Sequence, residues 1–574
     1  MKTTMFNHGS NEKGMALVIV LMVVMVFAIL GSAFIARTVN EKNTAEREKL
    51  LNQAFYVAEA GGDAGLARLD QLINTYLLNT VNATSPNVVS TKAATYTSTS
   101  NSLGMLIEYV KLGGVAQLTL AGTEALYNGT STALGAGTYT YNIVIKQKGN
   151  PQTITTDMWD FPYYYQVNST AAVQGTTRKV ALNGDFTVRV QRDNFANFAL
   201  FTDSHTMPDA TTVWFTSRTN FAGPLHTNQR YSFAFNPSGV FSGVVTQQYT
   251  TSRFYNNGFP LLADASANGA TDVPTFNSTY TRNSPAVVLA SSVVQADLAS
   301  QASGNTTISS TGIYVPVSGA NMRGGIYVKG NPTITMALDV SGRQRYTIAM
   351  ASFSTRTITV DRTLNRTGVR IGSDPTTWYN GLPDGVDNLG TILYVDGTIN
   401  GLSGTVQRQN EMTISASSSI NITNHIKYED YIAATGTPGT VGYIPPSAEN
   451  KDNLLGLVSW SGNINVTTAA PNNIEIHAIA MARNGILQVN NYGDTGVGSR
   501  GTATLLGGVI TQFYGAFGLF DSATGNPISG YGRNFVYDSR TLLGKAPPYF
   551  PSMSTFIAFT NDLTDKVSYQ EDGF

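Results

Sequence analysis

The residues from Gly14 to Ala36, GMALVIVLMVVMVFAILGSAFIA, form an apolar run that constrains the fold more than any other feature of the chain. No charged residue lies between Lys13 and Arg37. A helix rises about 1.5 Å per residue, so a run of this length just crosses a hydrocarbon core of about 30 Å. The run is therefore either a secretory signal peptide, which is removed, or a helix that stays in the protein.

The sequence after the run favours the retained helix. A secretory apolar region usually has about 7–15 residues and ends at a small-residue cleavage site, whereas this run is longer and continues directly into RTVNEK. Six acidic and five basic residues then lie between Arg37 and Asp70. An apolar stripe runs through them at helical spacing: Leu51, Phe55, Ala58, Gly62, Leu66, Leu69, Ile73 and Tyr76. We expect one long helix, with residues 15–36 in a membrane or fibre core and residues 37–78 packed along a soluble domain.

The junction at Gly14 carries a resemblance to a known family. A charged leader ends in Gly14, the apolar run follows at once, and AFYVAEAGGDAGLARL lies downstream. These segments resemble the amino-terminal region of type IV minor pilins of the PilX kind. The resemblance implies a leader over residues 1–14, cleavage by a prepilin peptidase between Gly14 and Met15, and N-methylation of Met15. It also implies that the helix contacts other pilins and minor pilins in the fibre, through residues such as Leu17, Ile19, Leu21 and Phe27.

One position departs from the family pattern. Most pilins carry a glutamate five residues into the mature chain, where it neutralises the new amino terminus of a neighbour, and this chain has Ile19 there. An uncompensated charge in hydrocarbon is costly, so a subunit without the glutamate is a poor repeating unit. One hypothesis is a low-copy role at the fibre tip or in assembly priming. The alternative is that the position varies freely.

Composition limits what the rest of the chain can be. The 574 residues suffice for several domains, and hydrophobic residues make up 42%, which is enough for a core. The chain has no cysteine, so disulfides, thiolate metal sites and cysteine catalysis are excluded. The net charge of −1, the 13% of charged residues and the 55 glycines are typical of an extracellular β-rich body.

Residues 79–191 predict a small antiparallel β domain. The Ser/Thr/Asn-rich stretch from Asn79 to Leu103 indicates a loop, and alternation begins at GTYTYNIVIK near Gly137. Two further alternating runs follow as a meander, with a tight turn expected at Leu182-Asn183-Gly184-Asp185. This arrangement resembles the sheet that pilins pack against their long helix.

Residues 192–551 predict a large β-rich domain. Short alternating runs recur between Gly, Asn and Asp, and no helical period of any length appears, so helices are not expected. The pattern is typical of a β-solenoid, which strands such as IAMA favour, or of a β-sandwich. Scattered motifs such as GTILYVDGTINGLSG resemble the ComZ-type competence pilins of Thermus-like bacteria. Residues 552–574 indicate a strand and a polar tail, so the expected class is α+β, mainly β.

Few residues indicate catalysis or metal binding. Asp203-Ser204-His205 is better explained as a loop turn than as a catalytic triad, because triads assemble from distant residues. His226 fits a turn or a packed structural histidine. Oxygen ligands at short spacing suggest a weak calcium site at Asp374, Asp384 and Asp387, although Asp-Gly-x-Asp-Asn is also ordinary turn chemistry. We expect no cofactor.

The sharpest local pattern is basic. Between residues 323 and 370, eight cations face only Asp339 and Asp361, which leaves a local charge of 8 − 2 = +6. The cations are Arg323, Lys329, Arg343, Arg345, Arg356, Arg362, Arg366 and Arg370. Tyr327, Tyr346 and Phe353 are interleaved, and arginine near aromatic rings suits phosphates and exposed bases. The pattern indicates either a stripe that captures DNA or solvated charge balanced by acids from neighbouring coils.

These observations and the resemblance together suggest a non-enzymatic minor pilin, held in the inner membrane before assembly and at the pilus or cell surface afterwards. The β-rich body is expected to capture DNA for natural transformation or to act as an adhesin for host or surface glycans. For adhesion, Trp214, Trp378, Tyr379 and Trp460 are the candidate contacts. A carbohydrate-active β-helix enzyme is the less favoured alternative, because it needs clustered carboxylates that the sequence does not reveal.

Overall fold

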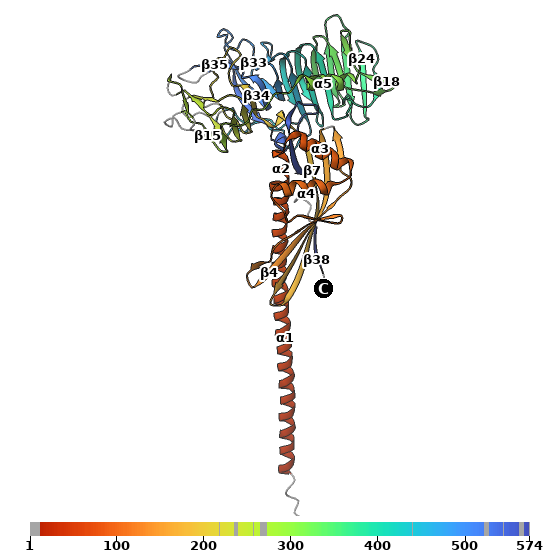
Figure 1. Cartoon of the computed structure of the whole chain (residues 1–574), viewed down its shortest axis with the longest axis vertical. Helices are drawn as coiled ribbons and strands as arrows, with labels where there is room; N and C mark the ends of the chain where they lie inside the picture. The colour runs from red at the N-terminus through yellow and green to blue at the C-terminus, as the bar shows by residue number, and fades with distance from the viewer. Residues whose placement is uncertain are drawn as a thin grey trace, which may run out of the picture. The chain divides into compact units, whose positions relative to one another are not determined.

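The computed structural model describes residues 12–155, 157–216, 219–234, 239–255, 258–263, 272–438, 440–521, 527–543, 545–561 and 568–572 (Figure 1). The fold is α+β and mainly β, with 22% helix and 42% strand. Two compact units share the chain: the first comprises residues 1–191 and 557–574, and the second residues 192–556. Most of the expected leader, residues 1–11, lies outside the described residues, as do parts of the expected tail.

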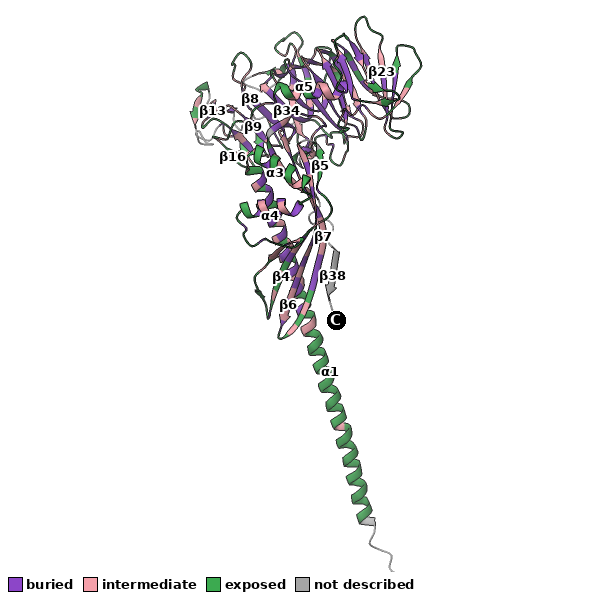
Figure 2. Ribbon diagram, turned by 45° about the vertical axis from the view of Figure 1, so that its right-hand side comes forward, coloured by how far each residue is buried: buried purple, intermediate pink, exposed green. Residues whose placement is uncertain are grey.

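One helix carries the amino-terminal part of the first unit. α1 (Glu12–Asp70) continues without a break into the π-helical segment η1 (Gln71–Leu78) and α2 (Asn79–Ala83). Its first half is bare, since almost every residue between Gly14 and Lys49 is exposed (Figure 2). The helix is long and apolar enough to cross a membrane once. The prediction of a single long helix is confirmed.

The second half of α1 packs closely on β4 (Gly137–Gln147) and β6 (Met158–Val173) because its contact face is made of small residues. A Cβ atom at Gly61 would lie 2.3 Å from Ser169 Oγ, and one at Gly65 would lie 2.3 Å from Val167 Cγ1. Ala54 and Ala58 are fully buried in the preceding turns. The buried stripe is therefore displaced from the predicted one toward these small residues.

Leu69 and Ile73 of the predicted stripe are fully buried, as expected for its core-facing side. Phe55, Leu66 and Tyr76 are only half-buried. The small residues decide the contact because the sheet approaches to a distance at which larger side chains do not fit.

The sheet of the first unit is antiparallel. Its strands follow the order β1 (Thr119–Ala121), β2 (Glu124–Asn128), β4, β6, β7 (Thr176–Asn194) and β37 (Ser552–Asn561). Shorter strands attach to this path: β3 (Thr132–Leu134), β5 (Gln152–Thr155) and β38 (Ser568–Asp572), which pairs with β7. The carboxyl-terminal segment thus returns to the first unit.

The predicted turn at Leu182-Asn183-Gly184-Asp185 is wrong. These residues lie inside β7, and Gly184 pairs with Tyr165 on β6. The hairpin turns instead at Gln174 and Gly175, whose φ angles of 46° and 83° suit a primed turn between twisted strands. Gly184 is explained by packing, because a Cβ there would lie 2.4 Å from the Tyr165 hydroxyl.

The predicted loop over residues 79–103 is also wrong. α2 is followed by α3 (Pro86–Ser98) and α4 (Ser102–Leu112). Pro86 opens α3, Val89 and Ala93 bury one face of it, and Asn101 caps α4 by accepting from the backbone N–H of Gly104 at 2.8 Å. The sequence did not reveal the helical period of α3, because the segment is rich in Ser and Thr and only two of its apolar residues are buried.

The second unit is dominated by two parallel ladders. The first ladder follows the order β20 (Ile326–Lys329), β26 (Thr391–Asp396), β28 (Glu411–Ala416), β30 (Leu454–Ser459), β32 (Glu475–Ala482), β34 (Ser499–Phe513), β8 (Leu200–Ser204), β9 (Leu225–Thr227) and β12 (Val245–Gln247). The second follows β21 (Thr333–Leu338), β27 (Ile399–Val406), β29 (Ile420–Tyr428), β31 (Ile464–Val466) and β33 (Leu487–Val489). Facing apolar residues of successive strands form the core.

The expectation that residues 192–551 contain no helix is wrong at α5 (Ser292–Ser303). Leu298 and Ala302 of this helix pack with Tyr327, Ile392 and other side chains on the outer side of the first ladder. This cover explains why β26 is apolar on both faces. The amphipathic period of α5 is weak because only Leu298, Ala302 and Ser303 are buried.

An antiparallel meander joins the second ladder at β21. It continues through β22 (Gln344–Ala349), β23 (Arg356–Asp361), β24 (Arg366–Ile371) and β25 (Thr377–Asn380). Gln344, Tyr346 and Ile348 are fully buried on one side of β22. The other side of the meander carries four of the eight predicted basic residues: Arg343, Arg345, Arg366 and Arg370.

Candidate functional sites

The outer side of the meander forms a polar surface, which we call the meander face. Strand alternation places on it Arg343, Arg345, Thr347, Thr357, Thr359, Asp361, Arg366, Arg370 and Trp378. Arg345, Thr359, Gly368 and Trp378 lie directly opposite one another across four strands. The prediction that Arg343 and Arg345 project together agrees with this placement.

Two of the arginines on the meander face are held in an ion-pair network. Arg343 contacts Asp339 at 2.7 Å and Asp361 at 3.4 Å, and Arg366 contacts Asp361 at 3.3 Å. Burial alone would raise the pKa of both carboxyls, but hydrogen bonds from the guanidinium groups and from backbone N–H groups hold each pKa below its ordinary value.

Trp378 belongs to the same network. The Arg366 guanidinium lies 4.2 Å from the centroid of its ring, and the Arg343 guanidinium lies at 5.5 Å. The indole packs over Gly368, where a Cβ would approach Trp378 Cζ3 to 3.0 Å. These contacts give Arg343, Arg366 and Trp378 a structural explanation.

The structure does not bring the eight cations into one stripe. Lys329 lies on β20 and pairs with Asp396 of β26 at 3.2 Å. Arg362 follows β23 and donates to Thr391 Oγ1 at 3.2 Å and to Asn410. Arg323 is exposed after β19 (Asn321–Met322), and Arg356 lies at the start of β23. Acids distant in sequence, such as Asp396, supply part of the balancing charge.

Arg345 and Arg370 remain on the meander face without an ion pair to any described residue. Arg370 is exposed and donates to Thr357 Oγ1 at 3.4 Å. The interleaved tyrosines do not contribute to this surface, because Tyr346 is fully buried and Tyr327 is 8% exposed and stacks on Tyr394. Phe353 is exposed in the β22–β23 turn.

The three calcium candidates have separate roles. The backbone carbonyl of Asp384 accepts from the Tyr549 hydroxyl, and burial raises the pKa of the Asp384 carboxyl. Asp387 accepts from Gln301 Nε2 at 2.7 Å, and Asp374 is exposed in a turn. Among the described residues, no three His, Cys, Asp or Glu side chains form a group that could hold a metal ion.

The histidines near Asp203 are packed rather than poised for catalysis. His205 is buried against Phe215, Tyr231 and Tyr514, and burial, with a smaller effect of Arg533, lowers its pKa to about 3. It follows the end of β8 and does not form a triad with its neighbours.

His226 stacks on Phe201 and is hydrogen-bonded to Thr246 and Asn228 at 2.8 and 2.9 Å. Its pKa is lowered by burial. The interpretation of His226 as a packed structural residue therefore fits its surroundings.

The four candidate glycan contacts do not form one surface. Trp460 is buried and donates to Ser415 Oγ at 2.9 Å, so it belongs to the core. Trp214 packs edge-on against Tyr255, and Trp378 lies in the arginine network of the meander face. Tyr379 is half-buried on β25, one residue after Trp378.

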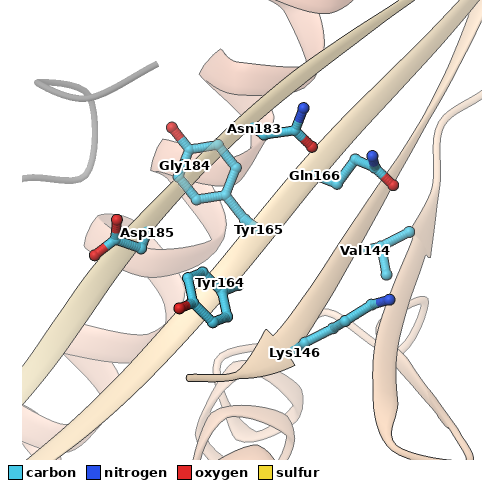
Figure 3. A pocket seen from close by; sticks show the side chains of 8 residues that line it. All are labelled: Val144, Lys146, Tyr164, Tyr165, Gln166, Asn183, Gly184 and Asp185. Carbon is cyan, nitrogen blue, oxygen red and sulfur yellow. The ribbon is translucent and has the colours of Figure 1, made fainter. Parts of the chain in front are cut away.

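A second polar surface, missed by the sequence analysis, lies on the first unit. The side of the sheet that faces away from α1 is hollowed around Val144, Lys146, Tyr164, Tyr165, Gln166, Asn183, Gly184 and Asp185 (Figure 3). Tyr164 is 50% exposed, whereas Tyr163 and Tyr165 beside it are buried. The run YYYQ indicated such a surface, because strand alternation turns at least one of three consecutive tyrosines outward.

The comparisons with known proteins give one partial match. A family model described as a domain of unknown function (DUF4900) matches residues 160–249, which span the end of the first unit and the beginning of the second. No curated protein matches the chain, and no solved structure matches it. The chain is therefore similar over this segment to a family whose function is not defined.

Proposed function

We propose that the protein is a minor subunit of a type IV pilus, inserted in the inner membrane through α1 before assembly. One observation carries the proposal: a single helix passes from a bare apolar half directly into a half that packs on an antiparallel sheet through Gly61 and Gly65. A cleaved signal peptide needs no such continuity, whereas a fibre subunit uses the same helix first as a membrane anchor and then as a packing element.

The proposal includes processing between Gly14 and Met15 and a low-copy role, at the tip or in priming. Gly14 lies in open space near the start of α1, and Ile19 is exposed within the apolar half. An isoleucine cannot compensate the amino terminus of a neighbouring subunit, which supports a subunit present in few copies.

The β-rich body is proposed to be a solenoid rather than a sandwich. Sandwiches are built from antiparallel sheets, whereas both ladders of the second unit are parallel. Amides stack along the second ladder, since Asn465 donates to Asn421 at 3.0 Å and Gln488 donates to Asn465 at 3.0 Å. Stacked side chains of this kind support a coil that repeats strand over strand.

Processing is tested by comparing two glycines of the same helix. We expect Gly14→Ala to leave the leader uncleaved, because the peptidase recognises the glycine before the cut. Gly31→Ala is the matched control, since neither glycine has another residue's atom within 4 Å of an added Cβ. Mass spectrometry of the mature amino terminus should find N-methylated Met15 in the wild type and in the control. Cleavage of Gly14→Ala at the normal site would contradict the proposal.

DNA capture is a second candidate, favoured by Arg345 and Arg370 on the meander face. Both lack an acidic partner among the described residues, and threonines surround them. Phosphate contacts make binding dependent on salt. We expect Arg345→Glu/Arg370→Glu to abolish a salt-dependent shift of a short duplex. Lys111→Glu/Lys179→Glu makes the same charge change at exposed positions of the first unit and should bind normally. Equal binding by all three proteins would exclude the meander face.

A further inference from the structure

The hollowed side of the first unit's sheet, which we call the sheet face, is ordered in cross-strand rows. Lys146, Tyr164 and Asp185 lie opposite one another on β4, β6 and β7, and Val144, Gln166 and Asn183 form the next row. Figure 3 shows the Tyr164 ring between Asp185 and Lys146, with the amides of Gln166 and Asn183 further along the strands.

The charges on the sheet face are balanced locally. Lys146 pairs with Glu124 at 2.7 Å, and Lys148 pairs with Asp185. Two cations and two carboxylates therefore leave no net charge around Tyr164. Such a surface does not attract a polyanion, and the ligand it suits is neutral.

The remaining chemistry is an exposed ring beside several amides. The Lys148 ammonium lies 5.4 Å from the centroid of the Tyr164 ring. Half of the surface of Tyr164 is nevertheless exposed. Asn168 donates to Asn142 at 2.9 Å and to Gln166 at 3.4 Å, which orders the amides. Each amide offers both donors and acceptors, and the Asp185 carboxylate keeps further acceptor sites beside its ion pair.

An aromatic ring bordered by ordered amides fits the two kinds of surface of a sugar. The C–H face of a pyranose packs on an aromatic ring, while its neighbouring hydroxyls both donate and accept hydrogen bonds. A folded peptide would need a larger apolar contact than one ring provides. Gly184 leaves room for the Tyr165 ring on the opposite, buried side of the sheet, so that Tyr164 is the tyrosine of this run that the sheet face presents.

We propose that the sheet face binds a neutral oligosaccharide, with one pyranose stacked on Tyr164 and its hydroxyls hydrogen-bonded to Gln166, Asn183 and Asp185. This site lies on the first unit, apart from the meander face, and does not depend on pilus assembly or on DNA capture. Binding here would make the protein an adhesin through its pilin-like domain.

The test uses the full chain in lauryldimethylamine oxide, a detergent without a sugar headgroup, titrated with cellohexaose and hexa-N-acetylchitohexaose, both neutral. Saturation-transfer NMR should show magnetisation passing from the protein to ring protons of at least one of the two sugars. We expect Tyr164→Ala to raise the Kd about tenfold, as for a central aromatic contact. Tyr164→Phe keeps the ring and should stay within about twofold of the wild type, and Gln166→Ala should weaken binding by about threefold.

Tyr56→Ala is the matched control, because Tyr56 is a tyrosine of the same unit that is 66% exposed on α1. It should bind both sugars as the wild type does, and thermal unfolding should confirm that every variant is folded. Failure of the full chain to bind either sugar would overturn the proposal. So would unchanged affinity in folded Tyr164→Ala, or displacement of the sugar by a DNA oligonucleotide.

Discussion

The two halves of α1 have the same backbone geometry and opposite surroundings. From Gly14 to Lys49 almost every residue is exposed with respect to the described part of the chain, and Gly31 has open space around an added Cβ. From Ala54 onward the helix is pressed against the sheet, and Gly65 leaves no room for a methyl group. The comparison teaches that glycines of one helix can have different roles. Gly31 lies where a larger side chain would also fit, whereas Gly65 sets the distance between the helix and the sheet.

The largest effect should come from filling the packed half. Gly65→Leu would push carbon atoms into Val167 and Tyr141, so we expect a loss of about 3 kcal/mol in the free energy of unfolding of the first unit. Denaturant unfolding followed by tryptophan fluorescence measures this. Gly31→Leu is the control and should leave unfolding unchanged, and equal stability of the two variants would break the comparison.

In the exposed half of α1, a charged substitution should impair membrane insertion rather than the stability of the folded body. Val24→Asp places a carboxylate in the apolar run, and we expect membrane insertion to become less favourable by about 3 kcal/mol. Membrane fractionation measures the change, while the unfolding of the soluble body should stay as in the wild type. Full insertion of Val24→Asp would show that this half does not lie in hydrocarbon.

Two arginines of the same helix sharpen the comparison at smaller magnitude. Arg68, in the packed half, lies 4.9 Å from the ring centroid of Tyr127 and 5.5 Å from that of Tyr76. We expect Arg68→Ala to destabilise the first unit by about 1 kcal/mol, since partly buried cation–π contacts are of this order. Arg68→Lys should recover part of the loss, and unchanged unfolding in Arg68→Ala would contradict the packing described for Tyr127.

Arg37, in the bare half, makes an exposed ion pair with Glu41 at 2.9 Å. Exposed i,i+4 pairs contribute about 0.3–0.5 kcal/mol, so Arg37→Ala should change the free energy of unfolding by no more than that. Helix content by circular dichroism and denaturant unfolding both measure it. If Arg37→Ala lowered the free energy of unfolding as much as Arg68→Ala does, residues 37–50 would have to be packed against another part of the protein, and the comparison would fail.

Prediction from the sequence succeeded for the features that depend on neighbouring residues along the chain. The continuous helix followed from an apolar run and a charged continuation, and the β-rich body followed from short alternating runs. Prediction failed where a partner distant in sequence decided the outcome. Asn183-Gly184 has the composition of a turn, but β6 pairs along its whole length and draws it into a strand.

The candidate sites show the same division. Counting charges between residues 323 and 370 found the arginines but could not find Asp396, which neutralises Lys329 from the next strand of the first ladder. The count also could not separate Arg345 from Arg343, which the turn at Asp339 and the neighbouring strand neutralise. The sheet face was missed because its charges and amides come from four strands, β2, β4, β6 and β7.

The sequence alone determined that the protein has one long apolar helix and a mainly β body, because helical length and strand alternation depend on neighbours along the chain. Only the tertiary structure decided which small residues of α1 meet the sheet and which arginines keep a free charge. It also decided that Tyr164, rather than Tyr163 or Tyr165, faces outward. These outcomes depend on register and on close packing between distant segments, which local composition does not specify.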